Sequence, residues 1–488
     1  MIARVTINVG LLRPLLSLAV MAGLLAGCAT FMPSDSGPAI SLPDPPKRAN
    51  QVEPVQREHQ RILAAYGGAY RNPRLQALLQ STVEKLVAAS DRPDLRYRVT
   101  ILNSPAINAF ALPSGYLYVT RGLLALANDT AEVASVLSHE MAHVTAQHAV
   151  TREAQAKQAS LVNRVATDVL SDPQTGAQAM ARSKLALASF SRSQELEADA
   201  MGVRTAAKAG YDPYGATRFL TAMGRNAELK VAKEDGRKPV DFLASHPSTP
   251  ERVKSVTSAA RQLSAPGTGS RDRQAFLAAT DGMTFGDDPG DGYVRGRRFI
   301  HPKLGITFTA PPDFALDNTA QAVLGMREGG AQALRLDVVQ ANEGQSLTEY
   351  LTSGWIENVE PKTVEEFDAN GSPGATAIAK GQDWTFRVYV IRSGSDLYRF
   401  VFAAKNRAAD VEKVFRESVL TFRRLSNEEI AQARPLRLQV VTVQSGDTAE
   451  RFAGRMATDR PLDRFRVING LDAGAALTVG EPVKIVVE

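Results

Sequence analysis

The histidines of this chain are concentrated in one short segment. The chain has six histidines among 488 residues, and three of them are His139, His143 and His148. The first two belong to the sequence S-H-E-M-A-H at 138–143. Residues four apart lie on one face of a helix, so both imidazoles can bind one zinc ion while Glu140 projects towards the attacking water. This spacing predicts a zinc site with a general base beside it.

The helix that carries this motif is expected to begin near Asp129 or Thr130, because either residue can cap it. Residues 131–137 are good helix formers, and their apolar side chains recur at helical spacing. His148 lies about 140° further around the same helix than His143. We therefore expect His148 to lie outside the site, as a solvated or core histidine.

A catalytic zinc site usually has three protein ligands and one open position, so a third ligand must come from elsewhere. The segment F-S-R-S-Q-E-L-E-A-D-A at 190–200 is expected to form a second helix. Glu195 and Asp199 share a face of that helix, whereas Glu197 is expected to point away into solvent. Glu195 would then bind the metal, and Asp199 would accept a hydrogen bond from the outer nitrogen of a ligand histidine.

These motifs together resemble those of the HtpX-like and BepA-like zinc metallopeptidases, which are gluzincins. The likeness covers roughly residues 58–262 and includes N-A-F-A-L-P at 108–113 and Y-V-T-R-G-L-L at 118–124. The resemblance also implies Glu195 as the third ligand and zinc as the cofactor, with one ion per chain. The tetratricopeptide repeats of BepA-like members and the membrane helices of HtpX are not recognisable in this sequence.

A second element of that family is a His-Pro sequence with a downstream arginine, which S-H-P-S-T-P-E-R at 245–252 matches. The resemblance implies that His246 and Arg252 lie near the metal. His246 would either donate to the developing oxyanion or act as a gate over the open coordination position. The sequence leaves both alternatives open.

The N-terminus predicts a lipoprotein signal peptide over residues 1–27. Basic residues precede an apolar run that ends in L-A-G-C, where Cys28 is the one cysteine of the chain. This ending resembles the bacterial lipobox, so we expect lipidation at Cys28. By resemblance to lipoprotein sorting, Ala29 in the next position indicates a periplasmic protein anchored to the outer membrane.

The chain is expected to have an α+β fold whose character changes along its length. A mainly helical gluzincin domain with a small β-sheet comes first, and its strands at 109–112 and 116–119 are expected to form a hairpin. An α+β domain of unknown role follows, and then a βααβ module with G-D-T at 446–448 and N-G-L at 469–471. These marks resemble those of LysM, a type of module that binds N-acetylglucosamine glycan. The expected boundaries are a flexible tether at 28–57, the peptidase domain at 58–263, a linker at 264–291, the α+β domain at 292–424, a linker at 425–438 and the LysM-like module at 439–488.

The expected function is hydrolysis of peptide bonds in unfolded or misassembled envelope proteins, with an extended substrate pairing along the strand at 109–112. Peptidoglycan is a further possible partner through the C-terminal module. Nucleic acid is not implied, because the formal charge is only +5 and basic residues are scattered among acidic ones. The alternative is a latent-zinc chaperone or cell-wall-binding envelope protein in which His246 fills the open position. A wall hydrolase is less favoured, because no paired-carboxylate glycosidase arrangement is apparent.

Overall fold

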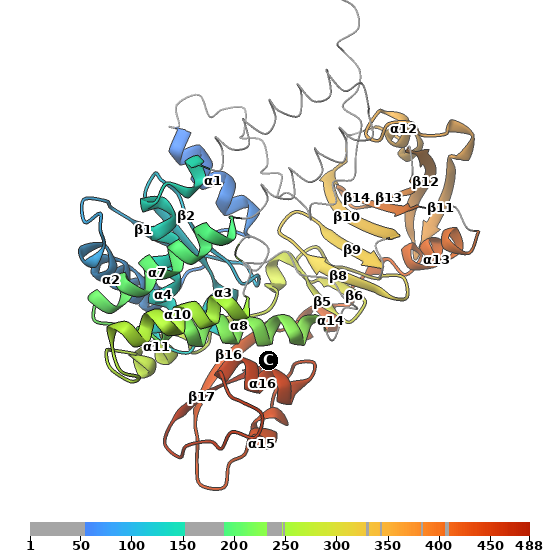
Figure 1. Cartoon of the computed structure of the whole chain (residues 1–488). Coiled ribbons are helices and arrows are strands. Elements are labelled where there is room, and N and C mark those ends of the chain that lie inside the picture. The colour runs from blue at the N-terminus through green and yellow to red at the C-terminus, as the bar shows by residue number, and fades with distance from the viewer. Residues whose placement is uncertain are drawn as a thin grey trace, which may run out of the picture. The chain divides into compact units, whose positions relative to one another are not determined.

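Figure 1 shows the computed structural model of the chain, coloured from blue at the N-terminus to red at the C-terminus. The expected signal peptide, Cys28 and most of the expected tether lie outside the residues that the structure describes. Among the described residues, no helix combines the length and the apolar character needed to cross a bilayer. The described residues are 54–151, 190–231, 246, 249–327, 331–341, 344–381, 384–405 and 409–488.

The first part of the chain is mainly helical and contains one small sheet. In this sheet β3 (Tyr116–Thr120) lies between β1 (Arg98–Leu102), which is parallel to it, and β2 (Ala109–Ala111), which is antiparallel. The expected hairpin is therefore confirmed, and β2 lies at the edge of the sheet as described. The helices of this part are α1 (Pro54–Ala65), α2 (Pro73–Ala89), α3 (Arg121–Leu126), α4 (Thr130–Thr145), α7 (Arg192–Lys208), α8 (Gly215–Val231) and α10 (Pro250–Leu263).

The H-E-x-x-H motif lies on α4, which passes through the core of this region. Its N-cap is Asp129, whose side chain accepts a hydrogen bond from the backbone N–H of Glu132 at 2.9 Å. Every residue from Thr130 to His143 is buried, so this helix has no solvent-facing side over those turns. Helix α4 thus holds its polar residues in a rigid, desolvated environment.

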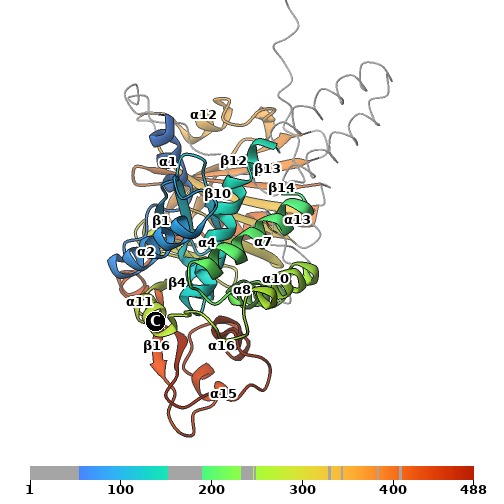
Figure 2. The same ribbon diagram turned by 60° about the vertical axis from the view of Figure 1, so that its left-hand side comes forward.

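Helix α7 packs directly against α4, as both ribbon views show (Figures 1 and 2). It begins with a capping box, in which the side chains of Ser191 and Gln194 each accept from the other's backbone N–H. Gly202 makes the close approach possible, because a Cβ there would lie 3.0 Å from the backbone N of His139. Ser138 also donates its hydroxyl to the carbonyl oxygen of Gly202 at 3.0 Å. The two helices therefore cross beside the first histidine of the motif.

The middle of the chain is rich in β-strands. Its larger sheet is antiparallel throughout, with α13 (Ala409–Val419) packed on one face and α12 (Leu347–Thr352) on the other. In sheet order, the strands are β11 (Glu365–Ala369), β12 (Ser372–Lys380), β13 (Thr385–Ser393), β14 (Asp396–Ala404), β10 (Gln332–Gln340), β9 (Val323–Arg327) and β8 (Phe314–Asn318). A second sheet contains β15 (Arg423–Arg424), β7 (Ile306–Thr309), β6 (Arg298–His301) and β5 (Tyr293–Arg295).

Three segments expected to be tether or linker contain regular structure. Helix α1 begins at Pro54, within the expected tether. The first expected linker contains α11 (Arg273–Thr280), whose Phe276 and Leu277 are fully buried, and β4 (Thr284–Phe285). The second contains α14 (Asn427–Gln432). The apolar residues of α11 occupy too short a run to show helical periodicity in the sequence, but they pack into the core of the peptidase region.

The C-terminal segment continues the same hydrophobic core. It runs from β16 (Leu436–Thr442) through α15 (Ala449–Ala453) and α16 (Pro461–Asn469) to β17 (Pro482–Val487). Strand β16 pairs with both β17 and β4, so the last segment shares a three-stranded sheet with an earlier one. Its buried side chains join one apolar cluster with those of α3 and α4. The fold as described is α+β, with a helical peptidase region and a C-terminal part rich in β-sheet.

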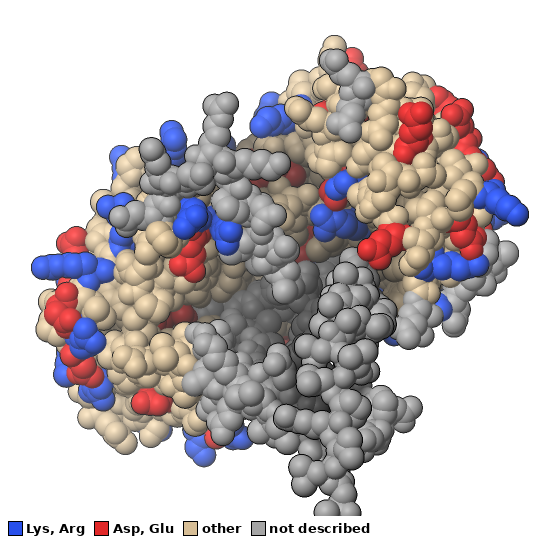
Figure 3. Space-filling model, turned by 90° about the horizontal axis from the view of Figure 1, so that it is seen from above, with Lys and Arg blue, Asp and Glu red and all other residues tan. Residues whose placement is uncertain are grey.

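The surface carries both signs of charge. On the face shown in Figure 3, basic and acidic side chains are interspersed over the described residues. That distribution agrees with the small net charge of +5. It gives this face no uniform basic stripe of the kind that binds nucleic acid.

Candidate metal centre

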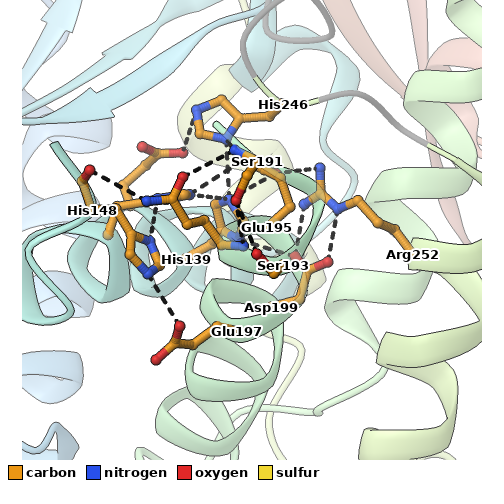
Figure 4. A network of polar contacts seen from close by, with 12 residues as sticks. His139, His148, Ser191, Ser193, Glu195, Glu197, Asp199, His246 and Arg252 are labelled. Atoms are coloured by element: carbon orange, nitrogen blue, oxygen red, sulfur yellow. Dashed lines mark hydrogen bonds and ion pairs between the residues drawn. The ribbon is translucent and has the colours of Figure 1, made fainter. Parts of the chain in front are cut away.

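Four side chains from three separate parts of the chain converge at one point, and Figure 4 labels three of them, His139, Glu195 and His246. His139 and His143 come from α4, Glu195 comes from α7, and His246 precedes α10. One possible ligand atom from each residue lies within 4.8 Å of the others, and all four residues are buried. The structure thus brings together the three expected ligands and the histidine of the His-Pro element.

The distances show which atoms face the centre. The Nε2 atoms of His139 and His143 lie 3.0 Å apart. They lie 3.6 and 3.5 Å from the two carboxylate oxygens of Glu195. His246 enters through its Nδ1, which is 3.3 Å from Nε2 of His139 and 2.8 Å from Oε1 of Glu195. The centre is therefore formed by three imidazole nitrogens and a carboxylate.

This donor set fits zinc. Imidazole nitrogen and carboxylate oxygen are both ordinary zinc ligands, and the site is closed to bulk water by the burial of all four groups. A neutral imidazole carries only one N–H, so hydrogen bonds alone cannot satisfy three ring nitrogens that converge on one point. A cation placed among them satisfies all of their lone pairs together.

Behind the ligands, a carboxylate and an arginine hold the first histidine. Nδ1 of His139 lies 2.9 Å from Oδ1 of Asp199, which is the contact expected for Asp199. Arg252 donates its Nε and Nη2 to the two oxygens of Asp199 at 2.8 and 2.7 Å, and its Nη1 lies 2.7 Å from Oε2 of Glu195. Burial alone raises the pKa of Asp199, but hydrogen bonds from Arg252 and His139 outweigh it and hold the pKa at about 2. Arg252 thus holds two carboxylates of the centre in place.

Glu140 lies beside the centre and is also buried. Its Oε1 has no hydrogen-bond partner among the described residues, and the nearest ionic contact is Nε2 of His246 at 3.8 Å. Burial, and then the charge of Glu195, raise the pKa of Glu140 well above its usual range. A divalent cation at the centre would oppose that shift and favour the ionised carboxylate.

His148 and Glu197 lie in the expected environments, a core histidine and an exposed acid, but His148 is closer to the site than expected. His148 is buried, and its Nδ1 lies 2.9 Å from Nδ1 of His143. The expected separation of about 140° between His143 and His148 assumed a continuous helix. Helix α4 instead ends at Thr145, and the backbone of Gln147 has a φ of 55°, which turns the chain back. Glu197 is exposed as expected, but its Oε2 reaches Nε2 of His148 at 3.3 Å.

Sequence reasoning missed these two contacts because nothing in A-H-V-T-A-Q-H at 142–148 marks the helix end. That stretch contains neither Gly nor Pro, which are the usual stop signals. The ring of Phe190 also stacks on His143, with centroids 4.0 Å apart, and this contact requires the tertiary fold.

The ligand set, the two crossing helices and the buried glutamate define a zinc metallopeptidase domain. Comparison with known families agrees, since residues 73–260 match the model of peptidase family M48. Residues 73–260 are therefore similar to an M48 metallopeptidase domain, and the expected likeness to BepA-like gluzincins is confirmed.

Curated relatives show the same likeness. The chain is 30% identical over 265 residues to the putative beta-barrel assembly-enhancing protease of Vibrio cholerae, covering 51% of this chain and 52% of the relative. It is 27% identical to the beta-barrel assembly-enhancing protease of Escherichia coli, over 47% of this chain and 49% of that one. It is 26% identical to the mitochondrial metalloendopeptidase OMA1 of Schizosaccharomyces pombe, over 41% of this chain and 58% of that one. The chain thus spans about half the length of the curated relatives it matches.

Proposed function

We propose that this chain is a zinc metalloendopeptidase of the bacterial periplasm that cleaves unfolded or misassembled envelope proteins. The observation that carries the proposal is the convergence of three imidazoles and Glu195 with Glu140 beside them. A purely structural zinc site has no need of a general base. The chain spans only about half the length of these relatives, so peptidase activity must be measured on this chain itself.

In the proposed reaction, a zinc ion held by His139, His143 and Glu195 would supply Lewis-acid chemistry, polarising the scissile carbonyl and lowering the pKa of a water molecule. Oε1 of Glu140 has no hydrogen-bond partner among the described residues, so it is available to take the water's proton. Glu140 then delivers that proton to the leaving amine. Asp199 keeps the proton of His139 on Nδ1, and Arg252 holds Asp199 and Glu195 in place.

The edge strand β2 provides a place for the substrate backbone. Its one described partner is β3, and it packs against α4, which carries the motif. An extended peptide that pairs with β2 would therefore run beside the metal ligands. Such pairing needs an unfolded segment, which favours misfolded or stalled proteins over folded domains.

The relatives' names suggest a narrower substrate class. Two of them are called beta-barrel assembly-enhancing proteases. By analogy, we infer that outer-membrane β-barrel proteins with unpaired strands are substrates of this chain. Envelope proteomics that compares wild type with Glu140→Gln tests this, because the substrates should accumulate in the variant. No change in any envelope protein would contradict the proposal.

A cell-wall role for the C-terminal segment is a separate proposal. The β-α-α-β order of residues 436–487 supports a LysM-like module that binds peptidoglycan. However, Asn469 in its N-G-L sequence is buried and binds the backbone of Phe465 and Lys484, which indicates a packing role for that residue. Sedimentation of the whole chain with purified peptidoglycan distinguishes glycan binding from packing alone.

The position of His246 favours a closed resting state of the metal centre. Its Nδ1 lies among the ligand atoms, where it would fill the coordination position that a catalytic site leaves open. This arrangement supports a latent resting form, in which His246 must leave before a substrate binds. A chaperone with permanently latent zinc would retain full function after Glu140→Gln.

A further inference from the structure

The two histidines of the motif have different partners on their outer nitrogens. Nδ1 of His139 faces the carboxylate of Asp199 directly. Nδ1 of His143 instead faces Nδ1 of His148 at 2.9 Å, and Nε2 of His148 faces Oε2 of Glu197 at 3.3 Å. Figure 4 shows His148 between the metal cluster and Glu197.

The direction of each hydrogen bond follows from the chemistry of the groups. A carboxylate only accepts, so Glu197 requires the proton of His148 to be on Nε2. Nδ1 of a neutral His148 is then an acceptor, and the proton between the two rings belongs to Nδ1 of His143. That tautomer leaves the lone pair of His143 on Nε2, the atom that faces Glu195 and His139.

We propose that His148 and Glu197 are positioning residues that fix the tautomer and ring orientation of His143 for metal binding. This inference rests on the proposed function, because it assumes that Nε2 of His143 binds zinc. No proton is transferred in this arrangement. Each group sets the hydrogen position of the next, as a carboxylate does for a ligand histidine in many zinc sites.

Packing supports the same role. The ring of Phe190 stacks on His143 at an interplanar angle of 27°, while the ring of His148 meets it nearly edge-on at 73°. The backbone of His148 is held by Gln194, which donates its side-chain amide to the carbonyl oxygen at 3.4 Å. His143 is therefore held by a ring on its face and a hydrogen bond at its outer nitrogen.

The two supports differ in strength. The side chain of Asp199 is 6% exposed and bound by Arg252, whereas the side chain of Glu197 is 59% exposed. Water competes for Glu197, so its own contribution is small. We expect His148 to matter more than Glu197, and Asp199 to matter more than either.

Zinc affinity of the full chain, measured by competition with a chromogenic chelator, tests the proposal. His148→Ala should bind zinc about 10–100-fold more weakly than wild type, because His143 loses its hydrogen-bond acceptor. His148→Gln offers a side-chain carbonyl as acceptor and should recover much of the affinity, whereas His148→Leu should not. Equal affinity in wild type, His148→Ala and His148→Leu would overturn the inference.

A double-variant comparison tests whether Glu197 acts through His148. Glu197→Ala should weaken zinc binding a few-fold alone, and should add nothing to His148→Ala. Asp199→Ala acts on the other histidine, so its effect should multiply with that of His148→Ala. Glu84→Ala, an exposed glutamate on α2, is the matched control and should leave zinc affinity unchanged. If the effects of Glu197→Ala and His148→Ala on zinc affinity are fully additive, Glu197 does not act through His148.

The absorption spectrum of the cobalt-substituted protein provides a second readout. His148→Ala should shift or weaken the ligand-field bands, and His148→Gln should restore them. If His148→Ala does not fold, the comparison of His148→Gln with His148→Leu decides the question. A wild type that binds zinc without cleaving protein refutes the proposed function and leaves this inference intact, whereas a wild type that binds no zinc refutes both.

Discussion

The ammonium group of Lys484 lies 2.6 Å from the carbonyl oxygen of Ala127, although 357 residues separate them in the chain. It also donates to the carbonyl oxygen of Ala125 at 2.8 Å. These carbonyls lie at the C-terminal end of α3, two residues before Asp129 caps α4. Strand β17 is therefore attached to the start of the metal-binding helix.

Lys484→Met should destabilise the peptidase region. The substitution keeps a long apolar side chain but leaves buried carbonyl oxygens without their donor, which costs about 1–3 kcal/mol. The measurement is the midpoint of chemical denaturation followed by circular dichroism. Lys413→Met is the control, because the side chain of Lys413 is 78% exposed. Equal midpoints for Lys484→Met and wild type would show that the hydrogen bonds of Lys484 contribute nothing to the stability of the fold.

The zinc ligands can be separated from the general base by metal content. His139→Ala and Glu195→Ala should lose most of their zinc, because each variant removes one of the side chains that bind the ion. Glu140→Gln should keep one zinc ion per chain while losing proteolysis, because it does not touch the ion. Chelator treatment of wild type should abolish cleavage, and added zinc should restore it. Loss of zinc in Glu197→Ala but not in Glu195→Ala would reverse our assignment of α7.

The local parts of this centre could be predicted from the sequence. His139, Glu140 and His143 occupy one turn of one helix, so their relative positions follow from helical geometry. The same argument places Glu195 and Asp199 together on α7. Only one assumption is needed in each case, namely that the segment is helical.

The tertiary contacts could not be predicted in this way. The contact between His148 and His143 depends on where α4 ends, and the bidentate pairing of Arg252 with Asp199 depends on how α10 packs on α7. Lys484 is the clearest case, because a lysine in a strand is ordinarily exposed. Its burial follows from acceptors that a distant helix supplies.

The membrane anchor is a prediction about residues outside the described part of the chain. Cys28→Ser should abolish incorporation of labelled fatty acid and release the protein from the membrane fraction, since the proposed lipid is its attachment. The experiment compares membrane and soluble fractions for both proteins in a bacterial host. Undiminished labelling of Cys28→Ser would refute lipidation at this position.

The last prediction concerns His246, whose two proposed roles give opposite results. A histidine that donates to the oxyanion should lower turnover by about one hundredfold when it is replaced by alanine. A histidine that closes the centre should instead raise basal cleavage of an unfolded protein. The structure favours the gate, because Nδ1 of His246 lies 2.8 Å from the ligand oxygen of Glu195 and 3.3 Å from Nε2 of His139. We therefore expect His246→Ala to cleave an unfolded substrate faster than wild type.

Two controls make this test decisive. Adding Glu140→Gln to His246→Ala should remove all cleavage, which shows that the increase arises at this centre and not from a contaminant. Zinc content must be measured in parallel, because removal of one of four donors weakens metal binding even when the gate is real. With zinc in excess, a clear fall in activity refutes the gate and supports the oxyanion donor. An unchanged rate refutes both roles, since each requires His246 to contact either the metal or the reacting carbonyl.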